Sequence, residues 1–399
     1  MNVETIPKLD EVLRLQPSRS VADCKTTRLT APGENYGSLM LRLEVKVVDE
    51  DSKSEENLDL VAKLLPPSKM MQEMFNVQTT FGNETGFYRD IVPVLEEFQR
   101  QHGLKVVNIF PKYYGSRISL DANCDKVDDG AVLILENLKP SGFTTANRTV
   151  GFDLQSSRFL AKHLAYFHAI SLALKLKNPG LFEQKVRPYL SDFRFGEHRN
   201  FDDFPPKLFN ILKENHTCVP FFDIIEKLIK QKSSVVIHEP FATMLHNDFW
   251  VNNVLLKFEN GIPVEVKIVD FQVIEYRSPC RDLLFFLFSS VQLKVLEEHL
   301  DRLIDCYYES FVEKLKEFKC DVEPFSREAF DKQLELAAKE AEYFHIVAML
   351  FPIHIDSSSV KDATEISPED MAKGGHVTRA CKDKLIFTTV EFIKRGWMC

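Results

Sequence analysis

The stretch MLHNDFWVNNVLLKFENGIPVEVKIVDFQ, residues 244–272, joins a polar loop to two apolar runs of strand character. The runs, residues 253–258 and 264–271, flank an Asn-Gly pair, the strongest short-range signal for a β-hairpin. A His, an Asp and two Asn stand just before the first run, and burying such groups is costly unless they are paired or used. The segment therefore predicts a polar loop followed by a hairpin that returns the chain to the side of that loop.

The polar loop has the spacing His-x-Asp-x-x-x-x-Asn, formed by His246, Asp248 and Asn253, and the second hairpin run ends at Asp270. Phosphoryl transfer from ATP needs such a set, because one carboxylate orients the acceptor hydroxyl while an amide oxygen and a second carboxylate hold Mg²⁺. We expect Asp248 to be the catalytic carboxylate and Asn253 and Asp270 to be the metal ligands. His246 is expected to support catalysis by holding the loop through hydrogen bonds.

The specificity of this pattern comes from its combination, since an isolated His-x-Asp triplet is common and usually structural. Trp250 most simply packs the loop against the helical part, and Asn252 has no role separable from that of a polar loop residue. Asp282 opens the apolar helix expected in YRSPCRDLLFFLFSS, residues 276–290. It is interpreted both as a helix cap and as a brace for the catalytic loop, and the two roles are compatible.

Around this segment the chain divides into a sheet-rich first third and a helix-rich remainder. Alternation of apolar and polar residues predicts strands, and apolar residues at helical spacing predict helices. Strands are expected within residues 21–29, 38–48, 58–65, 111–118 and 130–138. Helices are expected within residues 69–102, broken at Pro93, and within 152–177, 220–232, 281–318, 326–350 and 378–396. The predicted fold class is α+β, with a small antiparallel-sheet lobe at residues 1–138 and a large helical lobe with an inserted hairpin at residues 139–399.

The first lobe is expected to form the lid over a nucleotide. Between its first two strands lies APGENYGS, residues 31–38, where Gly33 and Gly37 permit close approach of the backbone to phosphates. Ser38 and backbone N–H groups of this loop, which includes Asn35, can donate hydrogen bonds to the phosphates. Two glycines are more often only a turn, and the loop lacks the three glycines of protein kinases.

Lys63, in LVAKLL, places an ammonium within an apolar strand, where lysine is rare unless paired. A functional lysine here would bridge the phosphates and be held by a helix carboxylate, for which Glu84 is the best candidate and Glu73 a competitor. The alternative for Lys63 is that it lies on an edge strand and reaches solvent. The alternative for Glu84 is that it lies on a solvated helix face. The linker LILENLKPSGF is expected to offer backbone groups to the base edge at Glu136, Asn137 and Leu138.

Composition limits the class of protein. The 399 residues, 44% hydrophobic and 27% charged, are typical of a soluble globular protein with an ample core. The net charge of −9 argues against a nucleic-acid partner, which usually needs a basic face. The most apolar run, residues 282–291, is too short to span a membrane, and the N-terminus lacks a secretory apolar region. The eight Cys form no close metal-type pair, so we expect a cytoplasmic protein with reduced thiols.

From about residue 30 to 290 the motifs resemble, in order, those of the ecdysteroid kinase-like (CHK kinase-like) proteins, chiefly of insects. This family is related to choline kinase and the aminoglycoside phosphotransferases. The motifs are GENYGS, LVAKLLP, FGNETGFYRDIVPVL, LILENLKPSGF, LAYFHAIS, MLHNDFWVNNVLL, KIVDFQ and SPCRDLLFFL. The resemblance implies a bilobal protein-kinase-like fold and ATP- and Mg²⁺-dependent phosphorylation of a small-molecule hydroxyl. It matches Asp248 to the base, Asn253 and Asp270 to the metal ligands, and Lys63 and Glu84 to the phosphate-bridging pair.

The sequence differs from protein kinases at two motifs. HND stands where protein kinases carry His-Arg-Asp, and DFQ where they carry Asp-Phe-Gly. The lack of an Arg beside Asp248 favours a small-molecule kinase without a phosphorylation switch. The family name suggests an ecdysteroid, another steroid or a xenobiotic alcohol as acceptor, and hence detoxification.

The apolar stretch EYFHIVAMLFPIHI, residues 342–355, could line a cleft for such an acceptor, although a Phe-rich core explains it equally well. A choline-like cation would favour an aromatic cage, and the chain has 2 Trp, so a neutral amphiphile is preferred. One alternative is a catalytically inactive relative that binds an apolar ligand. Another is a metal-dependent phosphoesterase, which usually gathers more ligands than this sequence offers.

Overall fold

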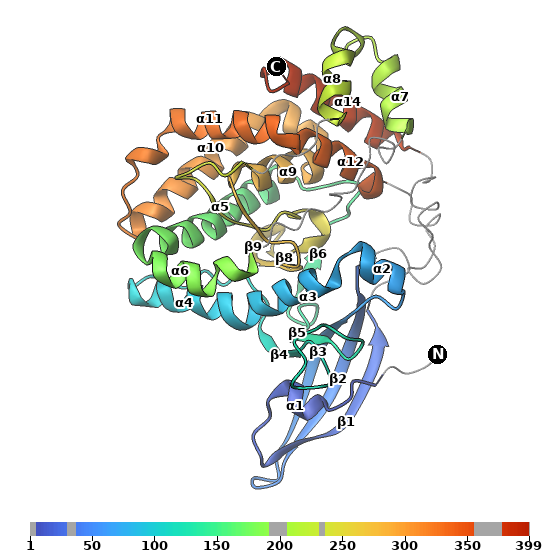
Figure 1. Ribbon diagram of the computed structural model, residues 1–399, viewed down its shortest axis with the longest axis vertical. Helices are drawn as coiled ribbons and strands as arrows, with labels where there is room; N and C mark the ends of the chain where they lie inside the picture. Colours follow the sequence, from blue (N-terminus) through green and yellow to red (C-terminus); the bar gives the residue numbers. More distant parts are fainter. Residues whose placement is uncertain (1–4, 30–36, 191–205, 231–235, 355–376, 399) are drawn as a thin grey trace.

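An antiparallel sheet forms one end of the molecule, and a larger helical body forms the other (Figure 1). The structure is a computed structural model that describes residues 5–29, 37–190, 206–230, 236–354 and 377–398. The strands of the sheet and several helices share the chain up to residue 136, and helices dominate after residue 154. The expected α+β fold class is therefore confirmed.

The N-terminal sheet has five strands in the order β1-β2-β3-β5-β4, with every neighbouring pair antiparallel. The strands are β1 (Arg19–Arg28), β2 (Leu39–Asp49), β3 (Glu55–Leu64), β4 (Tyr113–Arg117) and β5 (Val132–Glu136). Side chains alternate between the two faces, and Leu43 and Ala62 are buried on the face covered by the short helix α1 (Leu9–Leu13). Lys63 follows Ala62, so the same alternation turns it to the opposite face.

The chain between β3 and β4 forms α2 (Lys69–Met74), α3 (Val77–Gly86), a π-helical turn (Phe87–Ile91) and α4 (Val92–Gln101). The expected break at Pro93 was wrong in position, because the interruption lies at Asn76, which has a left-handed backbone with φ of 45°. Pro93 sits in the first turn of α4, but the residues before it are already helical, so the proline lies within a continuous helix and cannot donate a backbone hydrogen bond there. Directly before it, the π-helical turn absorbs one extra residue without ending the helix.

The helical body is built around α5 (Leu154–Lys177) and α9 (Cys280–Ser290), and every residue of α9 is buried. The expected helix at residues 281–318 is two helices, because the chain turns at Val291 before α10 begins. The other helices are α6 (Pro179–Lys185), α7 (Pro206–Glu214), α8 (Phe222–Lys230), α10 (Leu293–Glu317), α11 (Arg327–Ala337), α12 (Tyr343–His354) and α14 (Arg379–Lys394). No helix among the described residues has the length and apolar character to cross a membrane.

The predicted hairpin is present as β8 (Val254–Glu259) and β9 (Ile262–Ile268), joined by Asn260 and Gly261. Both turn residues have positive φ, 51° and 79°, which the tight two-residue turn requires. β6 (Phe143–Thr145) adds a third strand, and upstream β7 (Thr243–Leu245) pairs with β10 (Glu275–Arg277). The polar loop therefore lies between β7 and β8, and the end of β9 returns to it.

Replacing Gly115 by Ala is expected to loosen α1 from the sheet. A Cβ on Gly115 would lie 1.7 Å from the carbonyl oxygen of Val12 in α1. We expect the Gly115→Ala variant to lose about 1–3 kcal/mol of unfolding free energy, the usual cost of overpacking. Urea denaturation would measure the loss. In the control Gly180→Ala, nothing lies within 4 Å of the added methyl, so stability should stay equal or rise; equal effects of the two substitutions would contradict the prediction.

Candidate active site

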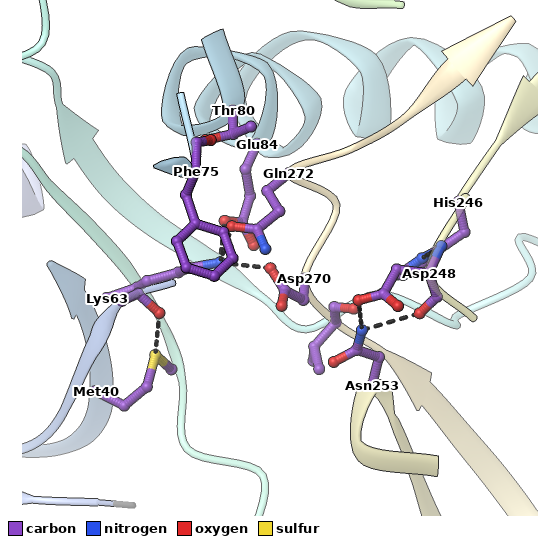
Figure 2. A network of polar contacts seen from close by, with 12 residues as sticks. Met40, Lys63, Phe75, Thr80, Glu84, His246, Asp248, Asn253, Asp270 and Gln272 are labelled. Carbon is purple, nitrogen blue, oxygen red and sulfur yellow. Dashed lines mark hydrogen bonds and ion pairs between the residues drawn. The ribbon is translucent and has the colours of Figure 1, made fainter. Parts of the chain in front are cut away.

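Lys63 lies at the centre of a buried ion cluster (Figure 2). Its Nζ is 2.6 Å from Oε2 of Glu84 on α3 and 2.5 Å from Oδ1 of Asp270, which follows β9. It also lies 3.4 Å from Oε1 of Gln272. Glu73, the competing candidate, is exposed on α2, so the structure places Glu84 against the lysine. Three segments far apart in the sequence thus meet at one amine.

The cluster holds more negative than positive charge. Burial raises the pKa of Glu84 to about 7, although Lys63 opposes the rise. Burial also disfavours charge on Lys63, but the carboxylates of Asp270 and Glu84 outweigh it and raise the pKa of the amine. One ammonium shared by two carboxylates leaves an excess of negative charge, which a further cation would relieve.

Asp248 and Asn253 are locked together in the polar loop. The amide Nδ2 of Asn253 donates to the backbone oxygen and to Oδ2 of Asp248, both at 2.9 Å. Figure 2 shows that this turns the oxygen of the Asn253 amide away from Asp248. Burial, reinforced by the charge of Asp270, raises the pKa of Asp248 well above its ordinary value. The loop carboxylate is therefore oriented, partly desolvated and close enough to Asp270 to interact with its charge.

Asp282 holds the backbone of the polar loop through hydrogen bonds. Its carboxylate accepts hydrogen bonds from the backbone N–H of His246 at 2.7 Å and of Asn247 at 2.8 Å. It also lies 3.0 Å from Nε2 of His168, a buried residue of α5 in the motif LAYFHAIS. Burial opposes ionisation, but the hydrogen bonds outweigh it and lower the pKa of Asp282. The first residue before α9 is Pro279, so the carboxylate serves the loop and not its own helix as N-cap.

His246 has structural contacts at both ring nitrogens. Its Nδ1 lies 3.2 Å from the N–H of Asp248, and its Nε2 lies 2.9 Å from the carbonyl oxygen of Val269. This pattern fits a neutral ring with the proton on Nε2, in agreement with burial, which lowers the pKa of His246. The imidazole therefore joins the Asp248 loop to the strand end that carries Asp270.

Phe271, which the sequence did not single out, holds the end of the hairpin against the π-helical turn that follows α3. It is fully buried, and its ring stacks on Phe87 with centroids 3.7 Å apart. Its neighbour Asp270 has φ of 70°, a left-handed conformation that is uncommon outside glycine. Packing of Phe271 thus helps to hold Asp270 in the backbone conformation that directs its carboxylate to Lys63.

The lid is only partly described, since Gly33 and Asn35 lie outside the described residues. A Cβ on Gly37 would lie 3.4 Å from the Phe75 ring and 3.7 Å from the side-chain amide of Gln272, so this end of the loop borders the Lys63 cluster. Ser38 is buried at the start of β2, with its hydroxyl 3.7 Å from the sulfur of Met40.

The linker passes beside a cavity of about 420 Å³ that reaches residues of β1 and β2. The amide Nδ2 of Asn137 donates to Oδ1 of Asp59 at 2.7 Å, and Asp59 also pairs with Arg42. Leu138 is buried, and the N–H of Glu136 donates to the carbonyl of Lys112 at 2.9 Å. Asp59 and Lys63 lie four residues apart on one face of β3, so the cavity and the ion cluster share that face.

The oxygen donors near the cluster match a lightly coordinated hard cation. Among the described residues there is no group of three or more His, Cys, Asp or Glu that could hold a metal. Mg²⁺ is usually bound by only one or two carboxylates together with substrate phosphates and water, so the set formed by the Asn253 amide oxygen and Asp270 fits it.

The ecdysteroid kinase-like family matches residues 32–320, a span that contains the ion cluster, the polar loop, the hairpin and Asp282. The chain belongs to this family. Membership confirms the resemblance seen in the sequence, the kinase-like α+β fold and the class of small-molecule phosphotransferases. None of the curated proteins matches this ecdysteroid kinase-like chain.

Solved structures of several small-molecule kinases are similar to the chain at low identity. An amicoumacin kinase, in complex with AMP-PNP and Ca²⁺, is 14% identical over 96% of this chain and 92% of its own, with a TM-score of 0.47. A Plasmodium vivax ethanolamine kinase is 12% identical over 94% and 84%, with a TM-score of 0.38. An aminoglycoside phosphotransferase in complex with GDP and kanamycin is 13% identical over 82% and 94%, with a TM-score of 0.37.

Removing the brace is expected to destabilise this ecdysteroid kinase-like protein. Asp282→Ala leaves buried donors of His246 and Asn247 without an acceptor, and each such group costs about 1–3 kcal/mol. The matched control is Asp223→Ala, because Asp223 is also acidic in the first turn of its helix, α8, but is exposed. The control should lose only about 0.3–1 kcal/mol. Denaturant unfolding measures both, and a loss for Asp282→Ala no larger than for the control would refute the bracing role.

Proposed function

We propose that this protein transfers the γ-phosphoryl group of ATP to a hydroxyl of a small apolar molecule, with Mg²⁺ as cofactor. The observation that carries the proposal is the convergence of Lys63, Glu84 and Asp270 in one cluster next to the Asp248–Asn253 pair. A chance arrangement of polar residues would not bring together a lysine paired with a carboxylate, an oriented aspartate and two oxygen-bearing side chains that can bind a metal. Phosphoryl transfer uses all of them for positioning and charge stabilisation.

In this proposal Asn253 and Asp270 hold the Mg²⁺, which neutralises charge on the phosphates when bound. Asp270 would exchange its contact with Lys63 for the metal, and Lys63 would remain held by Glu84 and face the phosphates. The excess negative charge of the cluster supports this assignment, since a divalent cation relieves it. Glu136, Asn137 and Leu138 would present the linker to the base, next to the cavity of about 420 Å³.

Asp248 is the proposed catalytic residue. Its carboxylate orients the acceptor hydroxyl and accepts its proton, and the raised pKa makes it a stronger base than an exposed aspartate. Asn253 fixes the orientation of the carboxylate, while His246 and Asp282 position the loop without touching the reacting atoms. The two lobes proposed for these tasks are residues 1–138 for the nucleotide and residues 139–399 for catalysis and the acceptor.

The acceptor class is proposed from the family, whose name points to ecdysteroids, with other steroid-like and xenobiotic alcohols as further candidates and cytoplasmic detoxification as the setting. Residues 342–355, which were expected to offer apolar side chains to a cleft, give this acceptor class little support. Most of their apolar side chains in α12 are buried against the core, in contact with α9 and α14. The core explanation therefore accounts for the described part of residues 342–355, and Ile355 lies outside the described residues.

Asp248→Asn is expected to lower turnover by roughly 10²–10⁴, the scale of a lost general base, with little change in MgATP binding. The protein is incubated with ATP, Mg²⁺ and a panel of ecdysteroids and other steroid alcohols, and mass spectrometry detects products with one added phosphate. The exposed Asp223→Asn is the control and should keep full activity. Full activity of Asp248→Asn would remove this residue from its role, and stabilisation by MgATP without ADP formation on any acceptor would support an inactive binding protein.

Nucleotide binding is expected to depend on the metal through Asp270. Saturation with ligand at 100 times its Kd stabilises a protein by about 2.7 kcal/mol, which thermal unfolding detects. For the wild type this stabilisation by ATP should require Mg²⁺ and disappear with excess chelator. Asp270→Asn should reduce it strongly even with Mg²⁺ present. ATP stabilisation that is the same with and without Mg²⁺ would contradict the proposed metal site.

A further inference from the structure

Tyr189 presses directly on a glycine of the helix that carries Glu84. A Cβ on Gly86 would lie 2.0 Å from Cε1 and 2.6 Å from Cζ of the Tyr189 ring, closer than real atoms approach. Gly86 is the last residue of α3, two positions after Glu84, and the helix continues beyond it into the π-helical turn. Glycine within a helix costs roughly 0.5–1 kcal/mol relative to alanine, so the position calls for a reason, and the close approach of the ring supplies one.

The hydroxyl of Tyr189 extends the same contact into the next turn. It donates a hydrogen bond to Oδ2 of Asp90, and it accepts one from Nη2 of Arg89 at 3.2 Å. Arg89 also pairs with Asp90, with Nη2 and Oδ2 2.7 Å apart. The ring and the hydroxyl therefore contact the end of α3 and the turn after it. The tyrosine thus restricts movement of this helix along its axis and rotation about it.

The contact joins two parts of the molecule that are distant in sequence. Tyr189 ends a short 3-10 turn, Arg187–Tyr189, that follows α6 in the helical body, whereas α3 lies between β3 and β4 of the sheet region (Figure 1). The Phe87–Phe271 stack holds the same stretch of helix from the hairpin. Glu84 is thus fixed by contacts both from the hairpin that carries Asp270 and from the helical body.

We infer that Tyr189 and Gly86 form a positioning contact that sets Glu84 at the distance at which it holds Lys63 for the nucleotide phosphates. This inference rests on the proposed function, because it assigns a purpose to the lysine. Tyr189 does not touch the ion cluster and acts through the helix. Loss of the contact lets α3 shift, lengthens the Glu84–Lys63 contact of 2.6 Å and weakens the hold of Lys63 on the phosphates.

The test compares two glycines of the same helix. Gly86→Ala introduces the clash with Tyr189, whereas at Gly82, one turn earlier, nothing lies within 4 Å of an added methyl. Calorimetric titration with MgATP gives the Kd, and thermal unfolding without nucleotide reports stability. We expect Gly86→Ala and Tyr189→Ala each to weaken MgATP binding about tenfold, and Gly82→Ala to leave it within about twofold, where tenfold corresponds to 1.4 kcal/mol. Lys63→Met provides the scale of losing the lysine itself.

The double variant Gly86→Ala/Tyr189→Ala separates a clash from a general effect on the helix. With the ring gone, the added methyl meets no obstacle, so the double variant should bind MgATP as Tyr189→Ala does, and not show the product of the two losses. Tyr189→Phe keeps the ring and removes the hydroxyl, so a loss smaller than that of Tyr189→Ala is expected. If Gly86→Ala does not fold, the two Tyr189 variants still decide the question.

The outcomes that overturn the inference differ from those that overturn the proposed function. If Lys63→Met weakens MgATP binding while Gly86→Ala and Tyr189→Ala bind as the wild type and only unfold at lower temperature, the contact is merely structural and the inference is wrong. If the wild type does not bind MgATP, or Lys63→Met leaves the affinity unchanged, the proposed role of the lysine fails and takes the inference with it.

Discussion

The sharing of the Lys63 amine between Glu84 and Asp270 is the interaction on which the rest of the structure depends. A buried ammonium without partners would be strongly destabilising, and each carboxylate alone would leave a comparable burden. The partners come from positions 21 and 207 residues away along the chain, so the strand, the helix and the end of the hairpin must be brought together before the lysine and Glu84 can be buried. The ion cluster thereby couples the sheet to the helical body.

Two further sets of contacts make this arrangement rigid. Asp282 and His246 connect the polar loop to α9 and to the end of β9 through hydrogen bonds, all within a buried region. Phe271 and Phe87 connect the hairpin to the π-helical turn after α3 through apolar contact. The hydrogen bonds orient the loop and the carboxylate of Asp248, and the aromatic contact holds the end of the hairpin in place. In the proposed phosphotransferase, such preorganised contacts would help to stabilise the charge that develops during the reaction.

Local patterns in the sequence predicted the five strands of the sheet and the longer helices, but they could not predict which distant residues contact one another. The hairpin could be predicted because Asn260 and Gly261 adopt the positive φ that its turn requires, and Lys63 stood out because its neighbours are apolar. The sequence favoured Glu84 over Glu73 but did not exclude Glu73, because both lie in a segment expected to be one helix, which the left-handed residue Asn76 divides into α2 and α3. The partnership of Asp282 with His168 and the contact of Tyr189 with Gly86 link residues about 100 positions apart, and no local pattern encodes them.

The sequence Asp-Phe-Gln at the end of the hairpin has a consequence for inhibition. Phe271 is fully enclosed by aromatic rings, and the residue after it is Gln272, which lacks the backbone freedom that glycine would give to a swinging segment. Expelling such a ring from its enclosure would cost about 3–5 kcal/mol, by analogy with truncation of a buried phenylalanine. For the proposed kinase site, compounds that require Phe271 to leave its place and open a space behind Asp270 are therefore expected to bind weakly, and inhibitors would have to occupy the cavity beside the linker or the proposed acceptor site.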